Sequence, residues 1–185
     1  VKFLPENLIL DKTTWTVPSS NSLTYSNQEI TFTDMLFTAK NQKVELTDKL
    51  DSLEKPHIAA VFNGFRLENL VSFLNPAEVI ADGSMQGRLI VLKPFGAIGI
   101  LSDLKIDSLA VLSTNLGTLT INAVAQTLGN YTLKADLGGG GIDLQVKGDI
   151  KSDEQAASFD LELDLTRLEL AILEDLIPEQ ITQAR

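Results

Sequence analysis

The chain has 185 residues, of which 44% are hydrophobic and 22% are charged, so it is long and apolar enough to form a domain with its own core. Its formal net charge of −10 gives a surface that repels phosphate backbones, which argues against nucleic-acid binding. The sequence contains no cysteine, and this excludes disulfides and thiolate metal ligands. Composition therefore predicts a globular chain without nucleic-acid partners.

The first third of the chain predicts short strands. Apolar and polar residues alternate over residues 15–17, 30–32 and 35–37. The alternation changes phase at Thr33 and Asp34, which predicts a turn or a bulge between two strands. Residues 41–56 are the most charged and least periodic stretch, and they predict a loop or a weak edge strand.

Two short segments have the periodicity of helices. Leucine and valine recur at three- and four-residue intervals from Leu67 to Leu74, which places them on one helix face and predicts a helix there. A second run of apolar residues predicts a helix from Leu168 to Ile177. A proline follows each segment, and helices commonly end before a proline.

The two helical segments predict an internal repeat. Each follows a predicted strand and begins with Arg-Leu-Glu, at Arg66 in the first segment and at Arg167 in the second. A strand-rich module closed by a short helix would then occur twice, over residues 1–76 and 77–178. Two unrelated helices with common residues are the alternative. Since the chain begins without methionine and stops soon after the second segment, we expect a single β-rich region, residues 1–185, cut from a longer protein.

The second half of the chain carries the strongest signal, a regular alternation of apolar and polar residues. Between Phe159 and Leu165, apolar side chains take every second position and three acidic residues take the others. This period of two predicts a half-buried antiparallel strand with one dry face. The four glycines at 138–141 separate two similar runs and predict a hairpin. The apolar set comprises Leu119, Ile121, Ala123, Leu133, Ala135, Leu137, Ile142, Leu144, Val146, Phe159, Leu161, Leu163 and Leu165.

Patterns for catalysis and metal binding are weak. His57 is the only histidine and begins a predicted strand, where a lone histidine is far more often structural than catalytic. The glycines at 138–141 precede an alternating strand, whereas a phosphate-binding loop precedes a helix. Asp160, Glu162 and Asp164 lie along one side of a predicted strand, unlike the ligands of a turned Ca²⁺ loop. The sequence therefore predicts a non-enzymatic protein with no cofactor and no metal.

Four motifs resemble those of a known family. They are residues 15–17 near the start, residues 63–70 at the start of the first predicted helix, a predicted turn and strand at 83–89, and residues 116–119. Their order is similar to that of the repeated modules of the TamB family, translocation and assembly proteins of the AsmA-like superfamily, in Bacteroidota-like forms. The resemblance covers nearly the whole chain.

The resemblance implies both a fold and a role. The fold is mostly β, an elongated curled antiparallel sheet (a β-taco, or repeating β-groove) with two short helices and an apolar inner surface. The alternating apolar residues named above would line this groove and contact phospholipid acyl chains, in phospholipid transport to the outer membrane and outer-membrane biogenesis. The parent protein would be anchored in the inner membrane, cross the periplasm and meet a barrel partner of the TamA/BamA kind through parts outside this chain.

Two other functions fit the same residues. An assembly scaffold would offer the edge of its sheet to unfolded outer-membrane strands by β-augmentation. An adhesive β-sandwich domain would close the same apolar residues into an ordinary core. A continuous open apolar face favours the lipid groove, a long exposed edge strand favours the scaffold, and a sealed core favours the adhesive domain.

Overall fold

The described part of the chain is mostly β-structure. The computed structural model describes residues 1–185 apart from 5–7, 11, 52, 54–55, 75–79, 97, 128, 153–156 and 173–185. Nine strands form one antiparallel sheet, in which each strand pairs with its neighbours in sequence. These strands are β5 (Leu36–Ala39), β6 (Gln42–Thr47), β7 (His57–Arg66), β8 (Ala81–Leu92), β9 (Gly99–Val111), β10 (Thr114–Thr127), β11 (Asn130–Gly139), β12 (Ile142–Ser152) and β13 (Ala157–Leu168).

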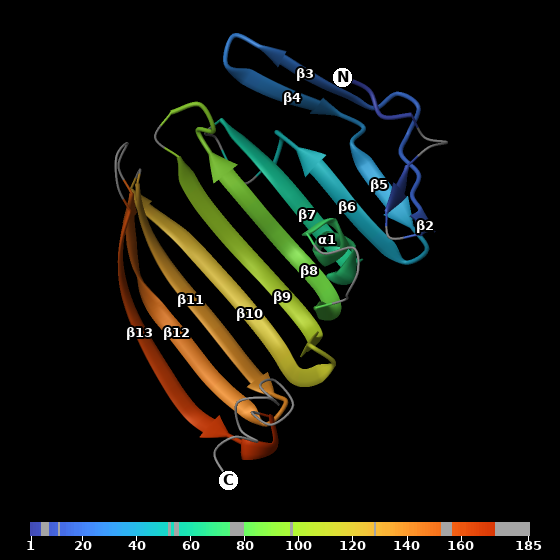
Figure 1. Ribbon diagram of the computed structural model, residues 1–185. Helices are drawn as coiled ribbons and strands as arrows, with labels where there is room; N and C mark the ends of the chain where they lie inside the picture. The colour runs from blue at the N-terminus through green and yellow to red at the C-terminus, as the bar shows by residue number, and fades with distance from the viewer. Residues whose placement is uncertain are drawn as a thin grey trace.

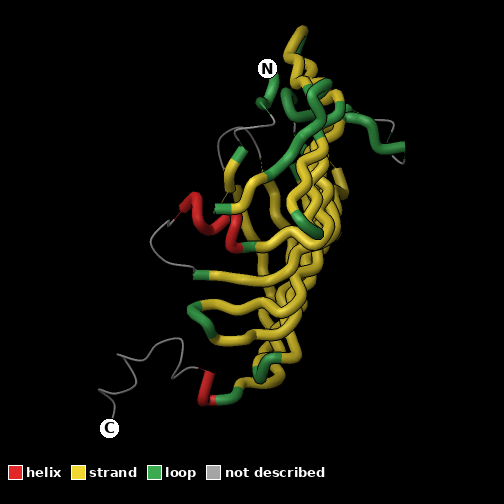
Figure 2. The backbone as a smooth tube through the Cα atoms, turned by 90° about the vertical axis from the view of Figure 1, so that its right-hand side faces the viewer, coloured by secondary structure: helices red, strands yellow, loops and turns green. Residues whose placement is uncertain are grey.

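The nine-stranded sheet is curled and does not close. Figure 1 shows the strands side by side from β5 to β13, and these two strands form the opposite edges of the sheet. In the view of Figure 2, the two helical segments lie to the same side of the strands. The predicted fold class, mostly β with a curled antiparallel sheet and two short helices, is confirmed.

Two small hairpins precede the large sheet. β1 (Ile9–Leu10) pairs with β2 (Thr13–Thr14), and β3 (Ser22–Ser26) pairs with β4 (Glu29–Thr33). Asp34 follows β4 and has a positive φ of 47°, a value that turns the chain before β5 begins. The predicted turn at the phase change is therefore confirmed, and it separates a hairpin from the large sheet.

The helix predictions agree with the structure within the described residues. The helix α1 (Glu68–Leu74) begins one residue later than predicted. A second helical turn begins at Leu170, because β13 continues through Leu168, where the helix had been predicted to start. Residues 173–177 of that prediction lie outside the described residues. The predicted hairpin at the four glycines is also confirmed, since it joins β11 to β12.

The two Arg-Leu-Glu motifs make the same local ion pair. The Arg66 guanidinium contacts the Glu68 carboxylate, and Arg167 contacts Glu169 in the same way. In both places the motif lies where a strand ends and a helical segment begins. Arg66 additionally contacts Asp82 of β8 at 3.0 Å. The internal repeat itself, with its modules 1–76 and 77–178, stays a prediction.

The prediction of a loop or weak edge strand over residues 41–56 is wrong for its first half. β6 lies inside the sheet, paired with both β5 and β7. Lys43 and Glu45 are exposed, whereas Val44 and Leu46 between them are half-buried. The stretch is thus a short amphipathic strand, and its high charge density concealed a period of two.

The turn predicted before Leu89 is also wrong, because β8 is continuous from Ala81 to Leu92. Its two glycines allow close packing instead of chain reversal. Gly87 has a φ of 113°, and a Cβ atom there would lie 1.9 Å from the carbonyl oxygen of Asp103 on β9. A strand glycine often marks such a close backbone approach or a bulge, and the pairing of β8 with β9 does shift between Asp82 and Ser84.

The core consists of two clusters of buried residues. The larger includes Trp15, Phe65, Met85 and Ile106, and the first of these is fully buried. The smaller consists of Ala59, Ile90 and Leu92, packed against partly buried residues that include Leu50 and Leu53. Since Ala59 and Ile90 alternate with residues of the other face, the smaller cluster lies on the opposite side of the sheet.

Candidate functional site

Strand pairing aligns apolar residues in rows across one face of the sheet. Residues that pair directly in antiparallel strands present their side chains on the same face. The first row consists of Phe65, Met85, Ile106, Leu119, Leu137, Leu144 and Leu165. The second consists of Phe37, Val44, Phe62, Gly87, Leu104, Ile121, Ala135, Val146 and Leu163. The third consists of Leu46, Ala60, Leu89, Ser102, Ala123, Leu133, Gly148 and Leu161.

The structure brings all of the predicted groove residues onto this face. Those that are not in the three rows are Ile142 and Phe159. Ile142 lies two residues from Leu144 on β12, and Phe159 lies two residues from Leu161 on β13, so both share the same side of their strands. We call the complete set of predicted groove residues, which lies on β10 to β13, the open apolar face.

The first row is buried at one end and exposed at the other. Phe65 and Met85 are each 4% exposed, and Leu165 at the edge of the sheet is 50% exposed. The residues between Ile106 and Leu165 in this row are half-buried. In the second row, Leu163 is 65% exposed. One apolar face therefore changes from a sealed core at β7 and β8 to an accessible surface at β13.

The sealed half of the face is covered by residues outside the sheet, among them Trp15 and Ile172. Trp15 packs its ring against Phe65 with 5.7 Å between the ring centroids. The helix α1 lies against the ends of β7 and β8 (Figure 1). It is fixed there by a buried hydrogen bond of 2.8 Å, in which the Asn69 side-chain amide donates to Oε1 of Gln42. No local sequence pattern indicates this cover, because its parts lie far apart in the chain.

The open apolar face is covered less. Ile172 of the second helical turn is buried and lies against Gly141, at the hairpin end of β11 and β12. Leu119, Leu137 and Ile142 pack at the border of the larger core cluster. The other members of the open apolar face are half-buried or exposed, and the β13 members are all exposed. This face thus presents a contiguous apolar surface beside a polar sheet edge, a feature typical of a binding site.

The reverse side of β10 to β13 is polar. The ammonium of Lys134 lies 3.0 Å from a carboxylate oxygen of Asp136, and the side-chain amide of Gln145 donates a hydrogen bond to the same carboxylate. The hydrogen bonds from Gln145 and Lys134 lower the pKa of Asp136 below its ordinary value. The strands therefore separate charged groups on one side from apolar side chains on the other.

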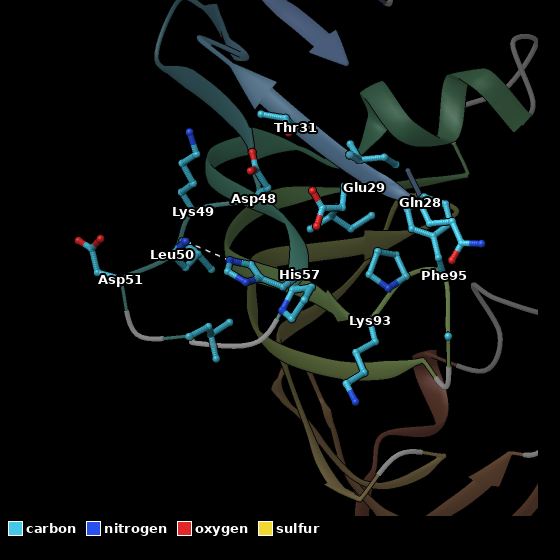
Figure 3. A pocket seen from close by; sticks show the side chains of 16 residues that line it. Gln28, Glu29, Thr31, Asp48, Lys49, Leu50, Asp51, His57, Lys93 and Phe95 are labelled. Carbon is cyan, nitrogen blue, oxygen red and sulfur yellow. Dashed lines mark hydrogen bonds between the residues drawn. The ribbon is translucent and has the colours of Figure 1, made fainter. Parts of the chain in front are cut away.

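A second candidate site is a cleft at one end of the sheet. It has a volume of 730 Å³ and lies between the β3–β4 hairpin, the loop after β6 and the loop after β8 (Figure 3). Its walls carry both acidic and basic side chains, among them Glu29, Asp48, Lys49 and Lys93. No sequence motif pointed to it, because its residues come from separate segments.

His57 is part of this cleft, and its geometry fits a structural role. The histidine is buried, and its Nε2 atom accepts a hydrogen bond of 3.0 Å from the backbone N–H of Leu50. Nearby, the backbone N–H of Phe32 donates to Oδ1 of Asp48 at 2.8 Å. Through these two bonds the loop after β6 is held between β4 and β7. The mixed charges of the cleft select no particular ligand, so the open apolar face is the stronger candidate.

Two further findings describe what the sites can hold. Within the described ranges, no group of three or more histidine, aspartate or glutamate side chains is placed to bind a metal ion together. Among the helices of the same ranges, none is both long and apolar enough to span a bilayer. The open apolar face itself consists of hydrocarbon side chains, which can bury the apolar surface of a ligand.

Comparisons with known proteins give no match. No protein-family model matches the sequence, and neither a curated protein nor a solved structure matches the chain. The resemblance to the TamB family, which rests on short motifs, therefore stays a prediction.

Proposed function

We propose that this chain is a non-enzymatic segment of a periplasmic envelope protein, and that its open apolar face carries phospholipid acyl chains. The observation that supports this most is the first row, in which exposure rises from 4% at Phe65 to 50% at Leu165 without a break in apolar character. A closed sandwich would cover both ends of such a row. An exposed end needs an apolar ligand or partner to remove it from water.

The dimensions of the open apolar face suit acyl chains. The four strands β10 to β13 extend over three inter-strand spacings, about 14 Å in total. Along the strands, the ten residues of β11 span roughly 33 Å. The acyl chains of one bilayer leaflet reach about 15 Å, half the thickness of the hydrocarbon core. One phospholipid therefore fits on this surface with both acyl chains against the sheet.

The chemistry of the face suits transport. Apolar contacts are non-directional, so an acyl chain can slide along a row without breaking specific bonds. Each methylene buried contributes about 0.8 kcal/mol, which is enough to retain a chain that is only partly covered. The polar reverse side keeps the sheet hydrated while its apolar side holds lipid.

The parent protein gives this surface its direction and partners. In the proposed role, it is anchored in the inner membrane and crosses the periplasm, and phospholipids move along it toward the outer membrane during envelope biogenesis. A barrel partner of the TamA/BamA kind would contact other parts of that protein. These features follow from the TamB resemblance, and the open apolar face is the property of this chain that agrees with them.

Mass spectrometry of lipids that co-purify with the parent protein tests the ligand. We expect phospholipids in the wild type. A Leu163→Glu or Leu144→Glu substitution is expected to abolish crosslinking to a photoactivatable acyl chain and to leave the isolated chain folded. The control is Glu162→Gln, a change on the polar side of β13 that is expected to keep crosslinking. Gross unfolding of both glutamate variants would contradict the proposal, because a glutamate buried in a sealed core costs several kcal/mol.

A further inference from the structure

His57 lies buried at the start of β7, against the segment that follows β6. The residue is 6% exposed, and its Nε2 atom accepts a hydrogen bond of 3.0 Å from the backbone N–H of Leu50 (Figure 3). An imidazole nitrogen accepts a hydrogen bond only while it carries a lone pair, so the proton of the neutral ring is on Nδ1. The bond to Leu50 therefore exists only in the neutral form of this histidine.

This hydrogen bond holds an apolar turn on the reverse side of the sheet. Leu50 and Leu53 both pack against the smaller core cluster. The backbone N–H of Leu53 donates to the carbonyl oxygen of Leu50 at 2.9 Å, so one short turn presents both leucines to that cluster. The bond from Leu50 to His57 joins the turn directly to β7. Release of Leu50 would therefore uncover buried apolar surface.

Protonation of His57 would remove this connection. A proton on Nε2 turns the acceptor into a donor, which would then oppose the backbone N–H of Leu50. The ring would also carry a positive charge in a site that is almost closed to water, and an unpaired buried charge is costly. Movement of Leu50 away from the ring admits water and removes both penalties. Histidine is the side chain whose ordinary change of charge falls between about pH 5 and about pH 8.

The charged groups that line the same cleft come from three parts of the fold. They are Glu29 of β4, Asp48, Lys49 and Asp51 after β6, and Lys93 after β8. In the sequence, Glu54 and Lys55 add one charge of each sign shortly before the histidine. Carboxylates outnumber ammonium groups in this set, so an imidazolium that gains access to water here is not repelled by its surroundings.

We propose that the hydrogen bond between Leu50 and His57 is a pH-sensitive latch, closed while the histidine is neutral and released when it is protonated. The closed latch keeps the two leucines on the smaller core cluster, and its release exposes them and widens the cleft. The latch is present at high pH and is lost as the pH falls, because the added proton removes the acceptor. The inference concerns the side of the sheet opposite the open apolar face and is independent of lipid binding.

Amide hydrogen exchange followed by NMR tests the latch on the 185-residue chain, in which the single histidine gives one ring signal to follow. Protection factors, which correct for the intrinsic pH dependence of exchange, are compared at about pH 7.5 and about pH 5. The protection factor of the Leu50 amide is expected to fall about tenfold at the lower pH, as one hydrogen bond is lost. The Leu46 amide donates to the Met35 carbonyl oxygen at 2.9 Å and is the internal reference, expected to stay unchanged.

His57→Gln is the matched variant, because glutamine offers a neutral oxygen acceptor that does not titrate. Its Leu50 amide is expected to be equally protected at both pH values. A loss of protection that the variant shares with the wild type would assign the effect to another group and overturn the proposal. In the wild type alone, a ring that stays neutral at the lower pH, or a protonated ring with a Leu50 amide that is still protected, would overturn it as well.

Discussion

The β7–β9 region and the β10–β13 region share one apolar face, which is buried in the first region and largely accessible in the second. In the first, Phe65, Met85 and Ile106 are buried in one cluster with Trp15 and Ile172, which lie outside the sheet. In the second, the same rows of paired residues end at Leu163 and Leu165, and both of these side chains are at least half exposed. Apolar side chains line this face in both regions. The two regions differ in the chain segments that cover this face, and this cover determines whether the face serves as a core or as a binding surface.

The largest contrast is expected when matching side chains are truncated in the two regions. Phe65→Ala is expected to lower the free energy of unfolding by 3–5 kcal/mol, as is typical for a buried phenylalanine. Leu163→Ala is expected to lower it by less than about 1 kcal/mol, because a side chain that is 65% exposed loses little buried area. Urea denaturation midpoints measure both values. Equal losses would show that the β13 residue is as well packed as the core.

Two strand glycines give a second, smaller contrast. A Cβ atom at Gly87 would lie 1.9 Å from the Asp103 carbonyl oxygen between two interior strands, and its φ of 113° disfavours other residues. Gly87→Ala is therefore expected to cost about 3 kcal/mol. At Gly148 the nearest atom is the Asp160 carbonyl oxygen at 2.0 Å, but it belongs to edge strand β13, which can shift.

Thermal unfolding of the two alanine variants measures this difference. Gly148→Ala is expected to lower the melting temperature less than Gly87→Ala. Gly96→Ala is the control, since its nearest neighbouring atom would be 3.9 Å away. A larger effect at Gly148 than at Gly87 would mean that the open region is the more rigid of the two.

The cover of the sealed region can be loosened through α1. Asn69 is 3% exposed and donates to Oε1 of Gln42, which also accepts from the backbone N–H of Arg66. Asn69→Ala is expected to cost about 1–2 kcal/mol, because the buried amide of Gln42 loses a partner. Amide hydrogen exchange is expected to quicken in α1 and at the adjoining ends of β7 and β8, and to stay unchanged in β12 and β13. Faster exchange throughout the sheet would contradict the separation of the two regions.

The smallest expected effect concerns acid stability in the open region. Hydrogen bonds from Gln145 and Lys134 lower the pKa of Asp136 in the folded state. A lowered pKa means that the carboxylate stabilises the fold above its unfolded pKa, and that this stabilisation is lost as the pH falls through the folded value. Asp136→Asn is therefore expected to lose slightly less stability than the wild type between about pH 5 and about pH 2. Urea midpoints across this range measure it, and identical pH profiles would contradict it.

Local patterns predicted most of the strands, the hairpin at the four glycines and the helix α1, because each depends on neighbouring residues. The strand predicted over residues 15–17 is instead a single bridge between Thr16 and Thr38. The alternation in Phe159 to Leu165, for instance, fixes which side chains share a face. The interior position of β6 was missed because Lys43 and Glu45 made a short strand resemble a loop.

The cover on the sheet could not be predicted by the same means. Trp15 contacts Phe65, which lies fifty positions later in the chain, and no local pattern records that contact. The glycines of β8 were assigned to a turn, since a sequence does not show that β9 approaches the backbone at Gly87. The candidate residues could therefore be named from the sequence, whereas their accessibility required the fold.

The most direct test of the central claim is photo-crosslinking with a phospholipid that carries a diazirine on its acyl chain, followed by peptide mapping. Adducts are expected on the apolar residues of β11 to β13, with the largest yields at Leu161 and Leu163, and a low yield at Met85 and Ile106 in the sealed rows. The polar side of the same strands, represented by Glu162, serves as the internal control. Adducts that are as frequent at Met85 or Glu162 as at Leu163 would contradict the assignment of the open apolar face to acyl chains.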